Sequence, residues 1–181
     1  MQWKIHGERP IYSSQWINVH LIDVELPDGH RFEHHAIRLQ PVAAMVVIDD
    51  CERVLLMWRH RFITDTWGWE IPMGIVEDGE TPAQTAARET EEETGWRPGP
   101  LSPLISYEPS NGISDSRHHL FRADGAAYQG TATDTTESDR IEWTALSDVQ
   151  QLISNGQLCD GPTLVGLLHV LAFPPAPKAK D

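Results

Sequence analysis

Four glutamates crowd into five positions of the stretch "RETEEETGW", residues 88–96. Glu89, Glu92 and Glu93 are spaced i, i+3 and i+4, so on a helix they share one face, whereas Glu91 points elsewhere. Three carboxylates about 5–6 Å apart repel one another by about 0.8 kcal/mol per pair in water, and by about 3 kcal/mol at an effective dielectric constant of 20. Such a face needs either bulk water or a positive charge beside it.

Two interpretations of this face are open from its residues alone. An exposed like-charge pair on a helix costs only a few tenths of a kcal/mol, so the glutamates could form an ordinary solvated surface. A hard divalent cation would instead turn the repulsion into binding, and Mg²⁺ prefers oxygen ligands while keeping water and phosphate oxygens in its shell. The helix would then be a metal platform for phosphoryl chemistry.

The net charge of the chain argues against one class of phosphate-bearing partner. Its 181 residues include 27 acidic and 14 basic side chains, which gives a formal net charge of −13. A nucleic-acid backbone needs a basic surface, so we expect no nucleic-acid binding. An acidic protein can still take a small phosphorylated substrate when a divalent cation lies between the two.

The acidic helix has clear start and stop signals. Thr81 is the expected N-cap, Pro82 occupies the first helical position, and Gln84 three residues after the cap completes a capping box. Gly95 is the expected end of the helix. Alanines and threonines form a thin face on this helix, which indicates close packing against another element.

Strand patterns flank this helix on both sides. Residues 11–40 are predicted to be strands with a hairpin turn at "PDGH". Further strands are expected at "AAMVVIDD", "RVLLMWRH" and "WGWEIPMG" before the helix, and at "LISYEP", "HHLFRA" and "RIEWTAL" after it. A short helix capped by Ser147 and an amphipathic helix over 161–173 follow. The pattern predicts an α+β or α/β/α layered domain.

Nothing in the chain resembles a targeting or membrane segment. No run of 18 apolar residues is present, and the N-terminus lacks the apolar region of a signal peptide. Cys51 and Cys159 lie far apart without metal-ligand spacing, which fits a reducing compartment. We therefore expect a cytoplasmic protein that does not bind membranes.

The residues around the glutamates have a recognisable spacing. Gly74 is followed after five residues by Glu80, after seven more by Arg88-Glu89, after two by Glu92-Glu93, and after one by Gly95. This resembles the Nudix box, the signature of the Nudix hydrolase family, and a chance match in a chain of this length is about one in a million. Thr90 replaces an aliphatic residue of the pattern, but it lies on the alanine face and leaves the acidic face intact.

The resemblance implies a metal site and a reaction. Glu89, Glu92 and Glu93 would bind Mg²⁺, with Mn²⁺ as an alternative, and the backbone carbonyl of Met73 would add a ligand. Glu92 and Glu93 would also take part in catalysis. The reaction implied is the attack of an activated water on one phosphorus of a nucleoside diphosphate linked to another group.

The other fixed residues of the box have structural uses. Gly74 lets the loop fold tightly, and Gly95 ends the helix. Glu80 is expected to orient the loop rather than bind metal. Arg88 has a planar, permanently charged fork that suits it to hold neighbouring carboxylates in place. The resemblance also implies the Nudix fold, an α/β/α sandwich with a mixed sheet and, here, a small N-terminal antiparallel β domain.

Residues outside the box resemble the ADP-ribose pyrophosphatase branch of the family. "VLLMWRHR" and "WGWEIPMG" look like the segments whose Arg and Glu contact substrate, here Arg61 and Glu70. One departure is that the usual Gln-Tyr-Arg stretch reads Arg59-His60-Arg61. The substrate implied is ADP-ribose or a related nucleoside diphosphate sugar.

The N-terminal strands resemble the extra β domain of the same branch, which exchanges between two subunits. The resemblance predicts a subdomain over 1–40 for dimerisation and substrate binding, a hydrolase domain over 41–173, and a disordered tail over 174–181. A homodimer is expected. Gly112 in the loop "YEPSNGISDS" would contact substrate, and Arg38 could either neutralise phosphate or serve the surface.

A general base is expected in the loop "TDTTESDRIEW". By resemblance, Glu137 is the first candidate, with Asp139 and Glu142 as weaker ones, and Glu142 is expected to be a solvent-facing strand residue. Two other functions remain open. One is a hydrolase of oxidised nucleoside triphosphates, which usually lacks the N-terminal domain. The other is a non-catalytic nucleotide sensor, which would not need all of the carboxylates.

Overall fold

The structure is a computed structural model that describes residues 2–134 and 138–174. Its backbone forms two compact units. The N-terminal unit consists of Met1–Pro41 and Tyr107–Arg117, and the core unit consists of Val42–Ser106 and His118–Asp181. The segment 107–117 therefore packs with the N-terminal strands, although the sequence places it between two strands of the core unit.

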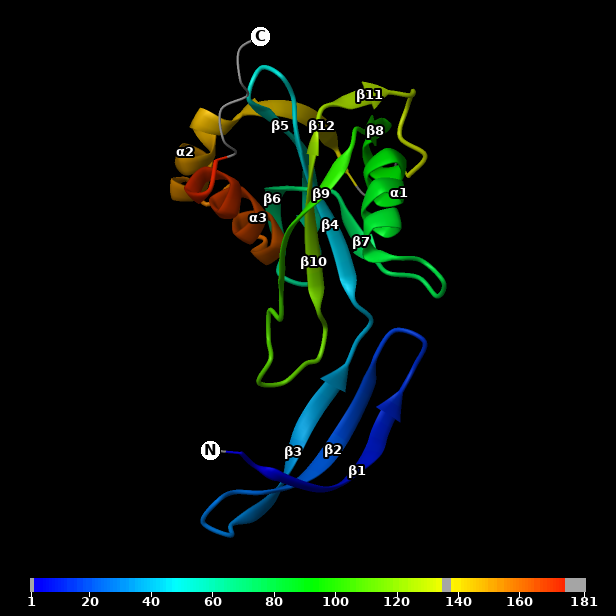
Figure 1. Cartoon of the computed structure of the whole chain (residues 1–181), viewed down its shortest axis with the longest axis vertical. Coiled ribbons are helices and arrows are strands. Elements are labelled where there is room, and N and C mark those ends of the chain that lie inside the picture. The colour runs from blue at the N-terminus through cyan, green and yellow to red at the C-terminus, as the bar shows by residue number, and fades with distance from the viewer. Residues whose placement is uncertain (1, 135–137, 175–181) are drawn as a thin grey trace. The chain divides into compact units, whose positions relative to one another are not determined.

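The N-terminal unit is a three-stranded antiparallel sheet in the order β1 (Lys4–Ser13), β2 (Asn18–Glu25), β3 (Arg31–Arg38), drawn in blue in Figure 1. The predicted hairpin turn joins β2 to β3, where the Leu26 amide donates to the His30 carbonyl at 2.8 Å. The expected small antiparallel sheet is confirmed. β1 begins well before residue 11, where the sequence predicts the first strand. Bulges in its register interrupt the alternation of side chains, so the sequence pattern does not reveal its first residues.

A mixed seven-stranded sheet organises the core unit. Its main order is β12-β5-β4-β10-β9, with β6 paired to β5 and β7 paired to β4. β4 and β10 run parallel, whereas β5 is antiparallel to β4, β6 and β12. The bounds are β4 (Val42–Ile48), β5 (Arg53–Arg61), β6 (Thr66–Glu70), β7 (Met73–Ile75), β9 (Leu101–Tyr107), β10 (His118–Asp124) and β12 (Arg140–Ala145). A separate two-stranded pair, β8 (Trp96–Pro98) with β11 (Ala126–Tyr128), has too few residues for the sequence pattern to predict it.

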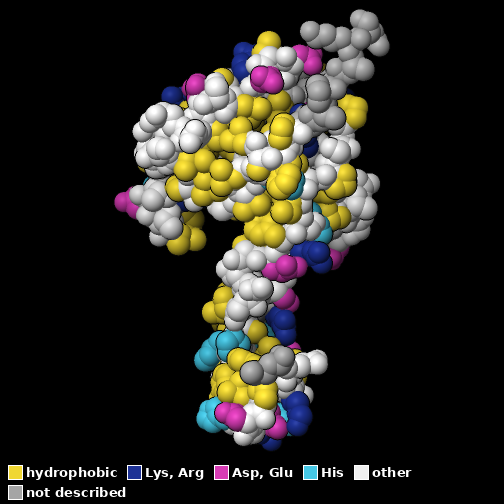
Figure 2. Space-filling view, turned by 60° about the vertical axis from the view of Figure 1, so that its left-hand side comes forward, with side chains coloured by type: hydrophobic (Ala, Val, Ile, Leu, Met, Phe, Trp, Pro, Cys, Tyr) yellow, Lys and Arg dark blue, Asp and Glu magenta, His cyan; other side chains and the backbone are white. Residues whose placement is uncertain are grey.

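Helices cover both faces of this sheet. Figure 1 shows α1 (Pro82–Thr94) on one side and α3 (Gly161–Ala172) on the other, with α2 (Val149–Ser154) beside α3. Because β4 lies between these layers, its residues from Ala43 to Val47 are wholly buried, and this explains its unbroken apolar run. The predicted layered fold with a mixed sheet is confirmed. Apolar side chains also reach the surface of the core unit (Figure 2), and α3 contributes exposed Leu168 and Leu171.

The N-terminal cap of α1 is as predicted, whereas that of α2 differs. At α1, the Thr81 hydroxyl accepts from the Gln84 amide at 3.3 Å and the Gln84 side chain accepts from the Thr81 amide at 2.8 Å, so the capping box is confirmed. Ser147 does not cap a helix, because it lies inside a 3₁₀ turn (Leu146–Asp148) that precedes α2. Across the described residues, no helix is long and apolar enough to cross a membrane.

The C-terminal end of α1 yields a first testable prediction. Gly95 adopts φ = 74°, and a Cβ there would lie 2.0 Å from the Gly130 carbonyl oxygen, whereas Gly79 has φ = 90° with open space around it. Gly79→Ala should therefore carry only left-handed strain, about 1–2 kcal/mol. Gly95→Ala should lose about 1–3 kcal/mol more, because its methyl group also displaces a packed backbone. Urea unfolding measures both, and equal losses would contradict the close contact between α1 and the 129–134 segment.

Candidate active site

The strand β7 brings the loop before α1 against the acidic helix. Gly74 pairs with Ala43 of β4, and a Cβ at Gly74 would fall 2.1 Å from the Glu89 Cδ atom. Glycine at this position therefore gives the Glu89 carboxyl group the space it occupies. The sequence expected Gly74 to serve the turn, but its φ is not left-handed, and the close approach of Glu89 is what requires glycine.

Arg88 lies at the centre of three carboxylates. Its Nε and Nη2 donate to Glu80 at 2.9 and 3.0 Å, and its Nη1 donates to Glu89 at 2.8 Å and to Glu92 at 2.9 Å. The Glu80 carboxylate also accepts from the Thr85 hydroxyl at 2.7 Å. The Arg88 fork, followed by Thr85, lowers the pKa of Glu80 to about 2, and the same partner raises the pKa of Arg88. Glu80 thus holds Arg88 in place, and Arg88 holds the two helix carboxylates.

Glu93 is turned away from Arg88 and into the protein. Its Oε1 accepts from Arg59 Nη1 at 2.9 Å and its Oε2 accepts from the Met73 amide at 2.9 Å. Glu93 and Arg59 are 3% and 6% exposed. Buried charges of this kind are tolerated only in pairs with good hydrogen-bond geometry. The carboxylate therefore ties α1 both to β5 and to the start of β7.

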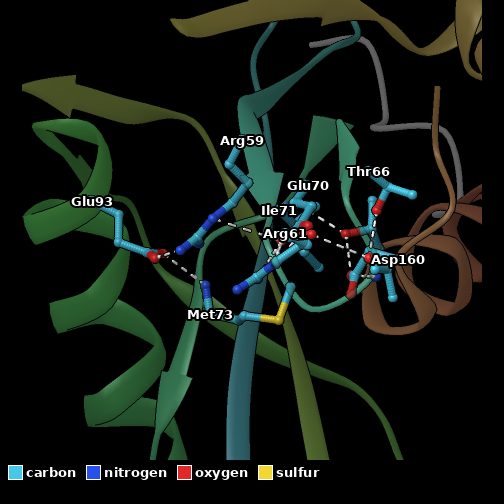
Figure 3. Close-up of polar contacts among 10 residues, drawn as sticks. Arg59, Arg61, Thr66, Glu70, Ile71, Met73, Glu93 and Asp160 are labelled. Carbon is cyan, nitrogen blue, oxygen red and sulfur yellow. Dashed lines mark hydrogen bonds and ion pairs between the residues drawn. The ribbon is translucent and has the colours of Figure 1, made fainter. Parts of the chain in front are cut away.

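A line of alternating charges continues from Glu93 across the sheet, as Figure 3 shows. Arg59 Nε lies 3.9 Å from Glu70 Oε2, and Arg61 Nε donates to the two Glu70 oxygens at 2.9 and 3.1 Å. Glu70 is only 3% exposed, and a buried charge needs a partner. The two arginines that flank it balance its charge. The order along the line is Glu93, Arg59, Glu70, Arg61.

This line of charges ends at a cavity of about 790 Å³ at the edge of β5 and β6. Arg59, Arg61 and Glu70 line it together with exposed Phe62 and Ile63 of the β5–β6 turn. Residues 159–161, which lead into α3, also contribute to its wall. Its volume lies in the range of small-molecule sites, about 300–1,000 Å³. Guanidinium groups beside apolar side chains suit a ligand that has an anionic part and an uncharged part.

The turn between β6 and β7 is anchored from the other side of the sheet. The Ile71 amide donates to the Thr163 hydroxyl at 3.1 Å, and Thr163 donates from its amide and its hydroxyl to Asp160 at 2.9 and 2.7 Å. Asp160 is the N-cap of α3 and lies on the right of Figure 3. The helix start therefore fixes the backbone that presents Glu70 and Met73.

Arg38 and Gly112, the other predicted substrate contacts, belong to the N-terminal unit. Arg38 donates to Glu8 at 3.1 and 2.9 Å and to Asp115 at 3.1 Å. The Gly112 carbonyl lies 2.9 Å from His34 Nε2. Both residues line a cavity of about 580 Å³ within that unit. The structure does not bring them together with the carboxylates of α1 in one compact unit.

The three candidates for the general base lie after residue 134, and Glu91 lies on α1. Glu137, the first candidate, lies outside the described residues. Asp139 donates its amide to the Trp58 carbonyl at 2.9 Å, and Glu142 is a half-exposed residue of β12 beside Arg140. Glu91 points away from the acidic face and accepts from Arg97 at 2.8 Å.

The three carboxylates that the resemblance assigns to a divalent cation are bound to arginine side chains in this structure. Among residues 2–134 and 138–174, no three His, Cys, Asp or Glu side chains converge on one point that could hold a metal ion. Glu89 and Glu92 nevertheless reach the same Arg88 nitrogen, and Glu89 lies against Gly74, next to Met73. This all-oxygen set has the chemistry that Mg²⁺ requires. Glu93 can join it only by sharing the carboxylate that Arg59 now holds.

Arg59 is the site residue that the sequence reading left without a role. On the opposite face of β5, Trp58 packs edge-on against Trp69, and the Arg140 guanidinium lies 5.3 and 5.1 Å from their ring centres. Because strand side chains alternate, Arg59 must then face α1. The sequence does contain a sign of this role: Arg59 lies two positions before Arg61, so both arginines are on the same face of an otherwise apolar strand.

Comparisons with known proteins identify relatives of this chain and structures that share its fold. The family model of the NUDIX domain matches residues 38–162. A CMP-5'-(N-acetyl-N-hydroxy-3-aminopropyl)phosphonate hydrolase of Streptomyces rubellomurinus is 46% identical over 96% of this chain and 84% of its own length. An ADP-ribose pyrophosphatase of Bacillus subtilis is 26% identical over 94% of this chain and 93% of its own. A crystal structure of an ADP compounds hydrolase has the same fold, with a TM-score of 0.82 at 17% identity over 95% and 94% of the two chains.

The Glu80–Arg88 contact predicts a pH dependence of stability. The Glu80 carboxyl group protonates near pH 4.5 in the unfolded chain and at about pH 2 in the folded one. Its contribution to stability is therefore complete above pH 4.5 and is lost progressively as the pH falls toward 2. The difference in urea midpoint between the unmodified protein and Glu80→Gln should shrink between pH 6 and pH 3. A difference that stays constant over this range would rule out the lowered pKa.

Proposed function

The chain belongs to the Nudix family of hydrolases, and from this membership we propose that it hydrolyses the pyrophosphate bond of ADP-ribose or a related nucleoside diphosphate sugar with the help of Mg²⁺. The products would be a nucleoside monophosphate and a sugar phosphate. The observation that carries the proposal is the continuous line of charges from the acidic face of α1 to the cavity lined by Arg61.

Each part of this line has a proposed use. Glu89, Glu92 and Glu93, with the Met73 carbonyl, would hold the cation. When bound, the cation supplies charge neutralisation for the pyrophosphate and activation of the attacking water. Arg61 would bind a phosphate oxygen, since Glu70 already fixes the direction of its planar fork.

The proposed reaction is a single displacement at phosphorus. The water oxygen forms a bond to one phosphorus, the bridging P–O bond breaks, and the departing phosphate keeps the electron pair. A base must accept the proton of the water, and we retain Glu137 for this role. The segment that leads to it is held on α1, because the Thr133 and Asp134 amides donate to the Glu92 carbonyl at 3.0 and 3.1 Å.

The N-terminal unit, predicted over 1–40, is proposed to pair two subunits and to contribute to the substrate site. β1 is exposed along its whole length, and an open strand edge invites pairing. Gly112 would contact substrate from this unit. The two carboxylates already bound to Arg38 favour the surface role that the sequence left open for it.

A second candidate substrate is a CMP-linked phosphonate. Its support is the relative at 46% identity, which covers nearly the whole chain. Such a compound would present the same P–O–P bond with a phosphonate in place of the sugar phosphate, so the acidic face and the arginines would act in the same way. The difference would lie in the base and in the group beyond the second phosphorus.

A substrate panel separates the two candidates. Purified protein with Mg²⁺ should release a nucleoside monophosphate from ADP-ribose, other nucleoside diphosphate sugars or a CMP-linked phosphonate, and chelation by EDTA should abolish the release. The ranking of kcat/KM across the panel identifies the substrate class. If oxidised nucleoside triphosphates are the preferred substrates, the proposal is wrong in substrate. Tight nucleotide binding without turnover of any compound would indicate a sensor.

A pair of neighbouring variants tests the acidic face. Glu92 carries a side chain that is 45% exposed, so Glu92→Gln should leave folding nearly unchanged. Its loss as a ligand should lower kcat by about 100-fold or more. Glu91→Gln is the matched control, because Glu91 contacts Arg97 away from this face, and it should keep kcat within about twofold. Similar kcat values for both variants would remove Glu92 from the site.

A further inference from the structure

Arg59 donates a hydrogen bond to the carboxylate of Glu93, which is one of the proposed ligands of the divalent cation. We propose that Arg59 is a positioning residue, an internal counter-cation that holds Glu93 in the metal-free protein and competes with the divalent cation for its carboxylate. This inference rests on the proposed role of Glu93 as a metal ligand. It holds for any substrate that the site accepts.

The geometry places one cation between two acids. Arg59 Nη1 lies 2.9 Å from Glu93 Oε1, on the side of α1, and Arg59 Nε lies 3.9 Å from Glu70 Oε2, on the side of the cavity. Figure 3 shows the guanidinium reaching from β5 toward both carboxylates. The closer contact is with Glu93, so the positive charge lies nearer the acidic helix.

Burial makes this contact strong enough to matter. Both members are almost wholly buried, so water screens their attraction poorly. The other Glu93 oxygen is fixed by the Met73 amide, which holds the carboxylate plane beside the proposed carbonyl ligand. A divalent cation that approaches Glu93 would meet a positive charge already in contact with it, and the two cations would repel each other.

The structure also offers Arg59 a second partner when a cation arrives. Glu70 is close enough to keep the guanidinium paired if its contact with Glu93 lengthens, so no buried charge is stranded. A carboxylate oxygen has lone pairs for more than one partner, so Glu93 can pass from one cation to the other through a shared state. Arg59 also lines the cavity, so its displacement would change the charge and shape of the cavity wall.

Arg59 should therefore lower the affinity of the protein for a divalent cation in the absence of nucleotide. Arg59→Gln removes the competing charge and restores the residue expected from the family pattern at this position. Mn²⁺ should bind this variant more tightly than the unmodified protein by about tenfold, the scale on which groups around metal ligands tune affinity. Arg59→Lys keeps the charge and should retain an affinity close to that of the unmodified protein.

The experiment is a Mn²⁺ titration of the full chain without nucleotide, followed by electron paramagnetic resonance of the free ion. Arg97→Gln is the matched control, since it removes the same charge from a residue that pairs with Glu91 near the end of the same helix. Its affinity should stay within about twofold of the unmodified protein. Circular dichroism establishes that each variant is folded.

Two results would overturn the proposal: an unchanged Mn²⁺ affinity in Arg59→Gln, or a weaker one, which would mean that Arg59 only orients Glu93. Should that variant not fold, arginine side-chain NMR of the unmodified protein decides. Mg²⁺ should shift the Arg59 guanidinium signals and leave those of Arg97 in place, and no shift at Arg59 refutes competition. Failure of the unmodified protein to bind either ion would instead refute the proposed metal role, whereas substrate turnover tests the proposed function separately.

Discussion

The pairing of a buried carboxylate with a buried guanidinium is the constraint on which the core unit depends. Glu93 is buried behind α1, and Arg59 supplies the positive charge that offsets the cost of burying its carboxylate. The pair fixes the distance between helix and sheet, and its second carboxylate oxygen fixes the start of β7. The same carboxylate thus joins α1 to β5 and to the residue that precedes Gly74.

Much of the fold could be predicted because its signals are local. The capping box at Thr81, the glycine that ends α1 and the turn after β2 are short-range features that residue type alone determines. Apolar patterns predicted the strands, and the resemblance implied that they form a mixed sheet. Short or irregular elements escaped: β8 and β11 are too brief for a period to show, and bulges hide the pattern of β1.

The candidate site divides in the same way. Arg88 reaches Glu89 and Glu92 within one turn of its own helix and Glu80 in the preceding loop, so motif spacing was enough to anticipate that cluster. The partner of Glu93 comes from a strand that lies far away in the sequence. No spacing rule connects Glu93 with Arg59. In the sequence, Arg59 stands out only because it replaces the Gln of the usual Gln-Tyr-Arg stretch. The packing of residues 107–117 with the N-terminal strands is long-range in the same sense.

The residues of the candidate site come from two parts of the core unit. One helix and the loop before it supply most of the proposed metal-binding cluster, whereas Glu93 is held from β5. The charge behind Glu93 and the arginine at the cavity come from β5, and Glu70 between them comes from β6. Because Glu70 contacts both arginines, a change at any one of these three residues alters the electrostatic environment of the other two. The proposed metal ligand Glu93 and the proposed phosphate contact Arg61 are therefore electrostatically coupled through Arg59 and Glu70.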